Sequence, residues 1–127
     1  MNTPQGHQAV MPYLILKDAA KFIDFTGKVF NATVTHRYGR DGDDSVIMHA
    51  EINISGSAVM FAESTEEYEV QNAGMFIYVD NTDETFARAK AAGAEVIIEP
   101  NDQEYGRTCG VKDPFGNVWW ITSVQHQ

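Results

Sequence analysis

The stretch VMPYLILKDAAKFIDFTGKVF, residues 10–30, changes from one pattern to another at Lys17 and Asp18. Residues 10–16 are apolar and rich in β-forming side chains, which indicates a strand. From residue 19 onward apolar side chains recur at helical spacing, and Asp18 stands where a helix N-cap is expected. The stretch therefore predicts a strand followed directly by a helix.

The stretch MFIYVDNTDETFARAKAAG, residues 75–93, repeats this order 63 residues later, since Ile23 and Phe86 occupy matching positions (86 − 23 = 63). Polar side chains at 80–83 can cap the second helix. Gly93 is expected to end that helix, because glycine accepts the left-handed C′ conformation. The two halves of the chain are therefore an internal repeat.

Each predicted helix leads into a β-rich segment and then a hairpin, with turns at Ser55–Ser57 and Asp113–Asn117. The fold class is therefore α+β: two βαβββ modules, about residues 10–63 and 74–123, whose curled mixed sheets surround a shared cleft. One domain is expected to account for residues 1–127, given the chain's length.

Three polar stretches are expected to lie outside the strands and helices. Residues 38–44 and 99–104 are predicted to be loops. The acidic run 63–69 is predicted to be a solvated linker between the modules.

Composition limits the classes of partner. The chain has 9 Lys and Arg against 18 Asp and Glu, a net charge of -9, so it should repel nucleic acids and anionic membranes while accepting cations. The single Cys109 excludes an internal disulfide, as is typical of a reducing compartment. Neither a signal peptide nor an apolar run near 20 residues is present, so we expect a soluble, cytoplasmic protein.

The closing stretch KDPFGNVW, residues 112–119, together with the βαβββ repeat, resembles the vicinal oxygen chelate superfamily. That superfamily includes glyoxalase I, extradiol dioxygenases, fosfomycin-resistance enzymes and bleomycin-binding proteins. Met48–Glu51 followed by the Gly56 turn resembles its PhnB-like branch. The resemblance covers about Met11 to Thr122 and implies the fold and a homodimer, but not one particular reaction.

In metal-using members, His, Gln or Glu side chains on the first and last strands of each module converge on a divalent ion. The resemblance places these four positions at Met11, Met60 (or Phe61, one residue along), Gly74 and Trp120. This set has thioethers but neither imidazole nor carboxylate, so it does not suit the metals of the family. We therefore expect neither a metal site nor a cofactor.

His49 and Glu51 are two residues apart on a predicted strand, so their side chains should share one face, with Ile47 and Asn53. The opposite face, expected to pack on the helices, comprises Met48, Ala50, Ile52 and Ile54. On the concave face the imidazole and carboxylate would bind polar groups or act as general acid and base. The alternative is a pair with only a structural role.

A metal ion held by His49 and Glu51 would need a third ligand. Sequence alone does not place His36 or Glu63 near them. His7 and His126 lie close to the ends of the chain and are expected to be unstructured rather than ligands.

Aromatic and thioether side chains gather where the metal-using members place their ligands. The expected concave side carries Met11, Tyr13, Met60, Phe76, Tyr78 and Trp120. Trp119 should instead enter the core, because neighbouring strand residues face opposite ways. Such a cleft suits flat or cationic ligands. The alternative is that these rings fill a core.

Tyr105 and Arg107 precede the last hairpin and are expected to gate the cleft or contact an anionic group, with a surface role as the alternative. Cys109 lacks a neighbouring base and is expected to be structural rather than nucleophilic.

The leading hypothesis is a metal-independent protein that resembles bleomycin-resistance proteins and sequesters an aromatic or cationic drug or metabolite. Two alternatives remain open. One is an enzyme of the superfamily that acts on a small substrate with His49 and Glu51 as acid and base. The other is a structural or regulatory protein with a vestigial cleft.

Overall fold

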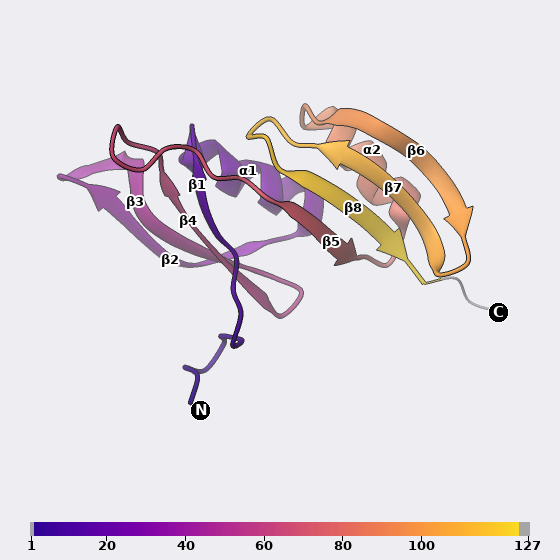
Figure 1. Cartoon of the computed structure of the whole chain (residues 1–127), viewed down its shortest axis with the longest axis horizontal. Helices are drawn as coiled ribbons and strands as arrows, with labels where there is room; N and C mark the ends of the chain where they lie inside the picture. The colour runs from indigo at the N-terminus through magenta and orange to yellow at the C-terminus, as the bar shows by residue number, and fades with distance from the viewer. Residues whose placement is uncertain (1, 125–127) are drawn as a thin grey trace. The chain divides into compact units, whose positions relative to one another are not determined.

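A computed structural model describes residues 2–124 and contains two compact units (Figure 1). The first unit comprises residues up to 27 and residues 31–72. The second comprises residues 28–30 and the chain from residue 73 onward. Residues 28–30 are the end of the first helix, and apart from them the units correspond to the two modules of the internal repeat.

The first unit holds a four-stranded mixed sheet with strand order β1-β4-β3-β2, in which β1 and β4 are parallel and the other pairs antiparallel. Its helix packs on the sheet through Phe22 and Phe61, whose rings meet edge to face at 5.0 Å. The elements are β1 (Tyr13–Leu16), α1 (Ala19–Phe30), β2 (Thr33–Arg40), β3 (Asp43–Ile54) and β4 (Ser57–Glu63).

The second unit repeats this topology with strand order β5-β8-β7-β6. Tyr13 aligns with Met60 in the first sheet and Phe76 with Trp120 in the second, at the spacing of the repeat (76 − 13 = 63). The elements are β5 (Gly74–Tyr78), α2 (Thr82–Ala91), β6 (Glu95–Gln103), β7 (Gly106–Lys112) and β8 (Val118–Ser123). The prediction of two βαβββ modules in an α+β fold is confirmed.

The start of α1 differs from the prediction, because Asp18 does not cap it. Asp18 has a left-handed backbone (φ 61°) and its side chain makes no capping bond. The Glu63 carboxylate instead accepts hydrogen bonds from the backbone N–H groups of Asp18 (3.0 Å) and Ala19 (2.9 Å). Glu63 pairs with Leu16 across β1 and β4 and so reaches these free donors. It is a capping residue at the end of β4, not part of a solvated linker.

The start and end of α2 agree with the sequence. The Asn81 side chain accepts a hydrogen bond from the Glu84 backbone N–H (3.1 Å), and Gly93 takes a positive φ of 99°. The helices are 12 and 10 residues long. No helix in residues 2–124 is long and apolar enough to span a membrane.

Two predicted loops belong largely to strands. At the first, only Asp41 and Gly42 separate β2 from β3, and both have positive φ, as a two-residue hairpin turn requires. At the second, β6 continues through Pro100 to Gln103. This edge strand tolerates proline because its pairing with β7 shifts register between Ile98 and Asn101.

The turn after β7 explains the KDPFGNVW stretch. Trp119 is buried in the second unit, where its ring meets Phe30 at 4.5 Å. Its indole N–H donates to Asp113 Oδ2 (2.8 Å), and Asp113 Oδ1 accepts from the backbone N–H groups of Phe115 and Asn117 (2.9 Å each). The turn therefore fixes Trp119 in the core and leaves Trp120 on the opposite face of β8.

Candidate ligand-binding site

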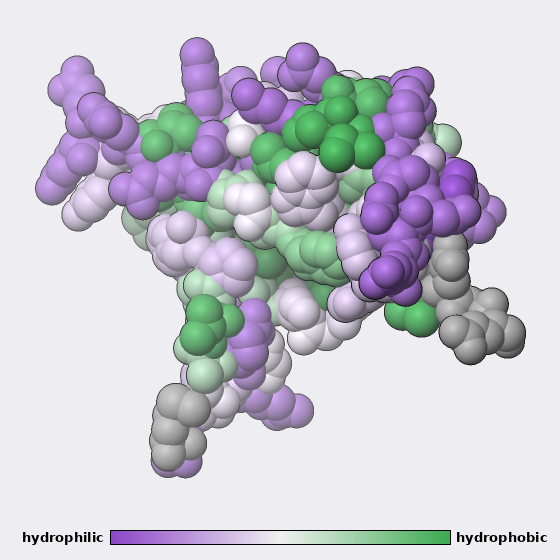
Figure 2. Space-filling model, turned by 45° about the vertical axis from the view of Figure 1, so that its right-hand side comes forward, coloured by the Kyte–Doolittle hydropathy of each residue, from purple (hydrophilic) through white to green (hydrophobic). Residues whose placement is uncertain are grey.

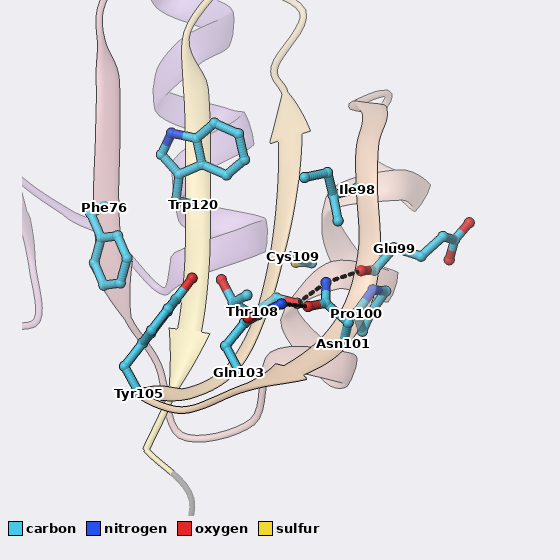
Figure 3. Close-up of a pocket in the computed structure, with 10 residues that line it drawn as sticks. All are labelled: Phe76, Ile98, Glu99, Pro100, Asn101, Gln103, Tyr105, Thr108, Cys109 and Trp120. Carbon is cyan, nitrogen blue, oxygen red and sulfur yellow. Dashed lines mark hydrogen bonds between the residues drawn. The ribbon is translucent and has the colours of Figure 1, made fainter.

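A pocket of about 610 Å³ lies on the second sheet, opposite Trp119 (Figure 3). The figure shows aromatic rings on one side and β6 residues on the other. The lining residues are Phe76, Ile98, Glu99, Pro100, Asn101, Gln103, Tyr105, Thr108, Cys109 and Trp120.

The Trp120 indole lies directly against the backbone of β7. Trp120 pairs with Gly110 across β7 and β8, and a Cβ atom at Gly110 would come within 2.5 Å of Trp120 Cζ3. Glycine is therefore needed for the ring to take this position. The indole is 36% exposed, so one face contacts the sheet while the other remains available to a ligand.

Two further rings extend this aromatic wall. Phe76 neighbours Trp120 on β5, and its ring centre lies 6.3 Å from that of Tyr105. Phe76 is 51% exposed and Tyr105 56% exposed, which is high for large aromatic side chains. Figure 2 shows an exposed patch of apolar side chains (green) bordered by hydrophilic ones (purple); tryptophan and tyrosine are pale on this scale, so the green patch is not the aromatic wall. Exposed aromatic surface makes this wall a candidate binding site.

The β6 side of the pocket presents amide groups. Asn101 Nδ2 donates to the backbone carbonyl of Glu99 (2.8 Å), and Gln103 Nε2 donates to Asn101 Oδ1 (2.6 Å). Figure 3 shows the Glu99 carboxylate directed away from the rings. The polar part of the wall is therefore neutral.

Cys109 lines the same pocket but is 1% exposed. Burial raises the pKa of its thiol to about 11, and the negative charge of Asp83 adds to the effect. The thiol therefore stays protonated at neutral pH and lacks nucleophilic character.

The pocket unites Phe76, Tyr105 and Trp120 from our predicted site, but its β6 residues and Cys109 were missed as ligand contacts. Residues 99–104 are predicted as a loop, and a loop gives no basis for assigning faces. The β-rich segment before them signals the start of the strand, but its continuation through Pro100 to Gln103 has no such local signal.

His49 and Glu51 have different hydrogen-bond partners, and a ligand or acid–base role for the two stays a prediction. His49 Nδ1 lies 3.2 Å from the Tyr13 hydroxyl, and the two rings stack at 5.7 Å. Glu51 is 4% exposed, accepts from Thr35 Oγ1 (2.8 Å) and lies 2.7 Å from His7 Nε2. Burial alone would raise the pKa of Glu51, but the hydrogen bonds from Thr35 and His7, with the histidine charges, lower it below its usual value.

The N-terminal segment is ordered around this carboxylate, so the expectation that His7 is unstructured is wrong. Beside His7, the Gln8 side chain donates to the Ala58 carbonyl (2.9 Å) and accepts from the Ala58 N–H (3.2 Å). These contacts join residues about 50 positions apart, which local sequence does not reveal. His126 lies outside the described residues.

A β-bulge reverses two of the predicted faces on β3. Tyr38 pairs with His49 and Gly39 with Ile47, which leaves Met48 as an extra residue. Ile47 is consequently fully buried with Ala50, Ile52 and Ile54, whereas Met48 is 50% exposed. Simple alternation had assigned Ile47 and Met48 the other way round.

Arg107 is held by two carboxylates. Its guanidinium donates to both oxygens of Asp83 (2.7 and 3.1 Å) and to Asp102 (3.1 Å). Hydrogen bonds to Asp83 and Asp102 raise the pKa of Arg107, and the bond from Arg107 lowers that of Asp83. An anionic ligand would have to displace these carboxylates, so a ligand role for Arg107 stays a prediction.

The remaining predicted residues do not line this pocket, although the Tyr78 ring lies 5.2 Å from that of Phe76. Tyr78 lines a separate pocket with Val124, and Tyr13 lines a pocket of the first unit. Met60 stands between Tyr13 on β1 and Glu51 on β3. Met11 precedes β1 and is half-buried. A ligand role for these residues also stays a prediction.

The metal positions of the superfamily do not fit a metal ion in this chain. Strand register selects Met60 rather than Phe61, because Met60 matches Trp120 and Phe61 is buried against α1. Met11, Met60, Gly74 and Trp120 together supply only thioether donors. Within residues 2–124, no cluster of three or more His, Cys, Asp or Glu side chains could hold a metal, and His36 Nδ1 lies 3.6 Å from Glu51 without completing one.

Residues 6–121 match the family model of the glyoxalase/bleomycin resistance protein/dioxygenase superfamily. The chain belongs to this superfamily. An uncharacterised protein of Mycobacterium bovis is 33% identical over 123 residues, which cover 87% of this chain and 80% of that protein. The resemblance inferred from the repeat and the KDPFGNVW stretch is confirmed.

Solved structures share the fold of this superfamily member. TioX from Micromonospora sp. ML1 is 26% identical, with a TM-score of 0.73, covering 93% of this chain and 100% of TioX. A PhnB protein from Bacillus cereus is 16% identical, with a TM-score of 0.72 and coverages of 92% and 100%. TnmS3 from Streptomyces sp. CB03234, described as an antibiotic binding protein, is 17% identical, with a TM-score of 0.70 and coverages of 94% and 100%.

Proposed function

We propose that this protein binds and sequesters a flat aromatic small molecule in the second-unit pocket without a metal ion. The observation that carries the proposal is the Trp120 indole, held against Gly110 and facing a pocket beside Phe76 and Tyr105. A volume of about 610 Å³ lies within the roughly 300–1,000 Å³ typical of small-molecule sites.

The walls favour a planar ligand with a delocalised positive charge. Aromatic faces attract cations, by roughly 0.5–2 kcal/mol per contact. The net charge of -9 also concentrates cations near the protein. Since the Glu99 carboxylate points away from the rings, a cation would be recognised by the aromatic wall and not by an ion pair.

Binding without chemical conversion is favoured by the state of the reactive groups. The Cys109 thiol is buried with a raised pKa, and His49 and Glu51 have separate hydrogen-bond partners. The description of TnmS3 as an antibiotic binding protein is consistent with such a role for the fold.

An enzyme that acts on a small substrate remains the second candidate. It is favoured by the buried Glu51 carboxylate, whose pKa is lowered next to His7 and His36. A group of this kind could exchange a proton with a ligand that displaced His7.

Assembly and location complete the proposal. Each sheet has two edge strands, of which β1 is partly covered by Gln71, and we propose that a second copy of the chain covers edges or apolar surface in a homodimer. A cytoplasmic location is a further part of the proposal. Sedimentation at micromolar concentration should give about twice the 14.1 kDa chain mass, and a monomer mass would contradict the dimer.

The experiment that tests the function uses 9-aminoacridine, a flat cation, and acridine, its neutral analogue, in buffer containing EDTA. Both should quench tryptophan fluorescence saturably, the cation at lower concentration. Mass spectrometry of the recovered compound should show it unchanged. If neither compound binds, the proposal fails for flat aromatic ligands.

The acid–base candidates separate binding from catalysis. His49→Ala and Glu51→Ala should leave both compounds unaltered and change affinity at most. If wild type converts a bound compound, and these variants bind it without converting it, the protein is an enzyme rather than a sequestering protein.

A further inference from the structure

A second pocket, of about 320 Å³, lies within the first unit. It is formed by β1, β3, β4, the end of β2 and the segment after β4. Its walls include the side chains of Tyr13, Met48 and Tyr68, and two charged residues, Arg40 and Glu63, also line it. Its volume is at the lower end of the range for small-molecule sites.

The β-bulge supplies one wall of this pocket. Because Met48 is the extra residue of β3, its side chain leaves the helix-facing side and joins Tyr13 at the pocket. A regular strand would place Ile47 there instead. A thioether beside an aromatic ring is an adaptable surface for an apolar ligand.

The segment after β4 supplies the opposite wall. Gln71 exchanges two backbone hydrogen bonds with Ile15, at 2.8 and 3.0 Å. A turn closed by Thr65 N–H to the Tyr68 carbonyl (2.8 Å) and Tyr68 N–H to Thr65 Oγ1 (2.9 Å) fixes Tyr68. The backbone that carries Tyr68, a lining residue of the pocket, is therefore held in place.

Arg40 lacks a carboxylate partner, although two carboxylates lie near it in the fold. Its Nη2 donates to the backbone carbonyl of Glu63 at 3.4 Å. The Glu63 carboxylate binds the first N–H groups of α1, and the Asp43 carboxylate accepts from the N–H and hydroxyl of Ser45. The ion pairs within residues 2–124 involve His7, His36 and Arg107, not Arg40.

We infer that this pocket is a second binding site, for a small aromatic carboxylate. The ligand ring packs against Tyr13, Met48 and Tyr68, and its carboxylate accepts two hydrogen bonds from the planar Arg40 fork. The net charge of -9 disfavours anions near the protein, so the preference for a carboxylate depends on the short-range contact with Arg40. The charge preference is opposite to that of the second-unit pocket.

The test is calorimetric titration with 2-naphthoate. Arg40→Gln should weaken its binding by about tenfold or more, as expected for loss of a charge-assisted pair. Arg37→Gln is the matched control, because Arg37 lies on the same strand and donates to the Asp44 carbonyl, outside this pocket. The neutral 2-naphthamide should bind wild type more weakly than 2-naphthoate.

Trp120→Ala distinguishes this site from the proposed function, since it should weaken 9-aminoacridine binding and leave 2-naphthoate binding unchanged. Amide chemical-shift changes caused by 2-naphthoate in the wild-type protein should map to Tyr13, Met48 and Tyr68. The inference is overturned if wild type does not bind 2-naphthoate at millimolar concentration, if Arg40→Gln binds it normally, or if the shifts map to Phe76 and Trp120.

Discussion

Replacing Gly110 with alanine should displace the Trp120 ring and impair the pocket. The new Cβ would lie 2.5 Å from Trp120 Cζ3 and 2.8 Å from Cε3, whereas ordinary contacts begin at 3.4 Å. The ring must therefore move outward by about 0.9 Å (3.4 − 2.5) into the space that a ligand needs. Overpacking of this kind costs about 1–3 kcal/mol, partly offset by about 0.4–1 kcal/mol because alanine restricts the unfolded chain.

The measurements for Gly110→Ala are urea unfolding, the tryptophan emission spectrum and the dissociation constant for 9-aminoacridine. We expect a net loss of about 1–2 kcal/mol in unfolding free energy, altered emission and weaker binding. Gly74→Ala is the matched control, because a Cβ at this glycine of β5 meets no atom within 4 Å. If Gly110→Ala behaved like Gly74→Ala in all three measurements, the described contact between ring and strand would be wrong.

Three further predictions concern the buried groups. Trp119→Ala should lower the urea-unfolding free energy by about 3–5 kcal/mol, since it empties the core beside Phe30; a loss below 1 kcal/mol would contradict the assigned strand faces. His7→Ala should cost about 1–3 kcal/mol at pH 7, because Glu51 loses a buried partner. Because the pKa of Glu51 is lowered in the folded protein, Glu51 stabilises the fold above the ordinary carboxyl pKa, and this stabilisation should disappear as the pH falls through the pKa of the folded protein. If the loss of unfolding free energy caused by His7→Ala did not change with pH in acid, this reasoning would be refuted. Cys109 should resist thiol reagents at pH 7.5 until urea unfolds the protein, and rapid labelling of the folded protein would be inconsistent with its burial. Because folding raises the pKa of the Cys109 thiol, the unfolding free energy should fall between about pH 9 and pH 11.

Features encoded by local spacing could be predicted from the sequence. The 63-residue repeat gave both modules, and alternation placed Trp119 in the core and Trp120 on the exposed face. Asn81 and Gly93 delimit α2 because capping and left-handed geometry depend on the residue itself.

Features that depend on distant contacts could not be predicted in the same way. Glu63, not Asp18, caps the start of α1 because β4 pairs with β1. His7 is ordered because it contacts the Glu51 carboxylate. The bulge at Met48 depends on the pairing of β3 with β2 and reverses a face that alternation had assigned. Long-range pairing therefore accounts for these differences in the first unit.

The central claim is that Trp120 forms a ligand site that functions without a metal. Its most direct test is the dissociation constant of 9-aminoacridine, measured by calorimetry in EDTA, for wild type and Trp120→Ala. We predict saturable wild-type binding with one site per chain, weakened by roughly 1–3 kcal/mol in Trp120→Ala, the range for losing a large aromatic contact. Equal affinity in the two proteins, or wild-type binding that appears only when a divalent metal is added, would contradict the account.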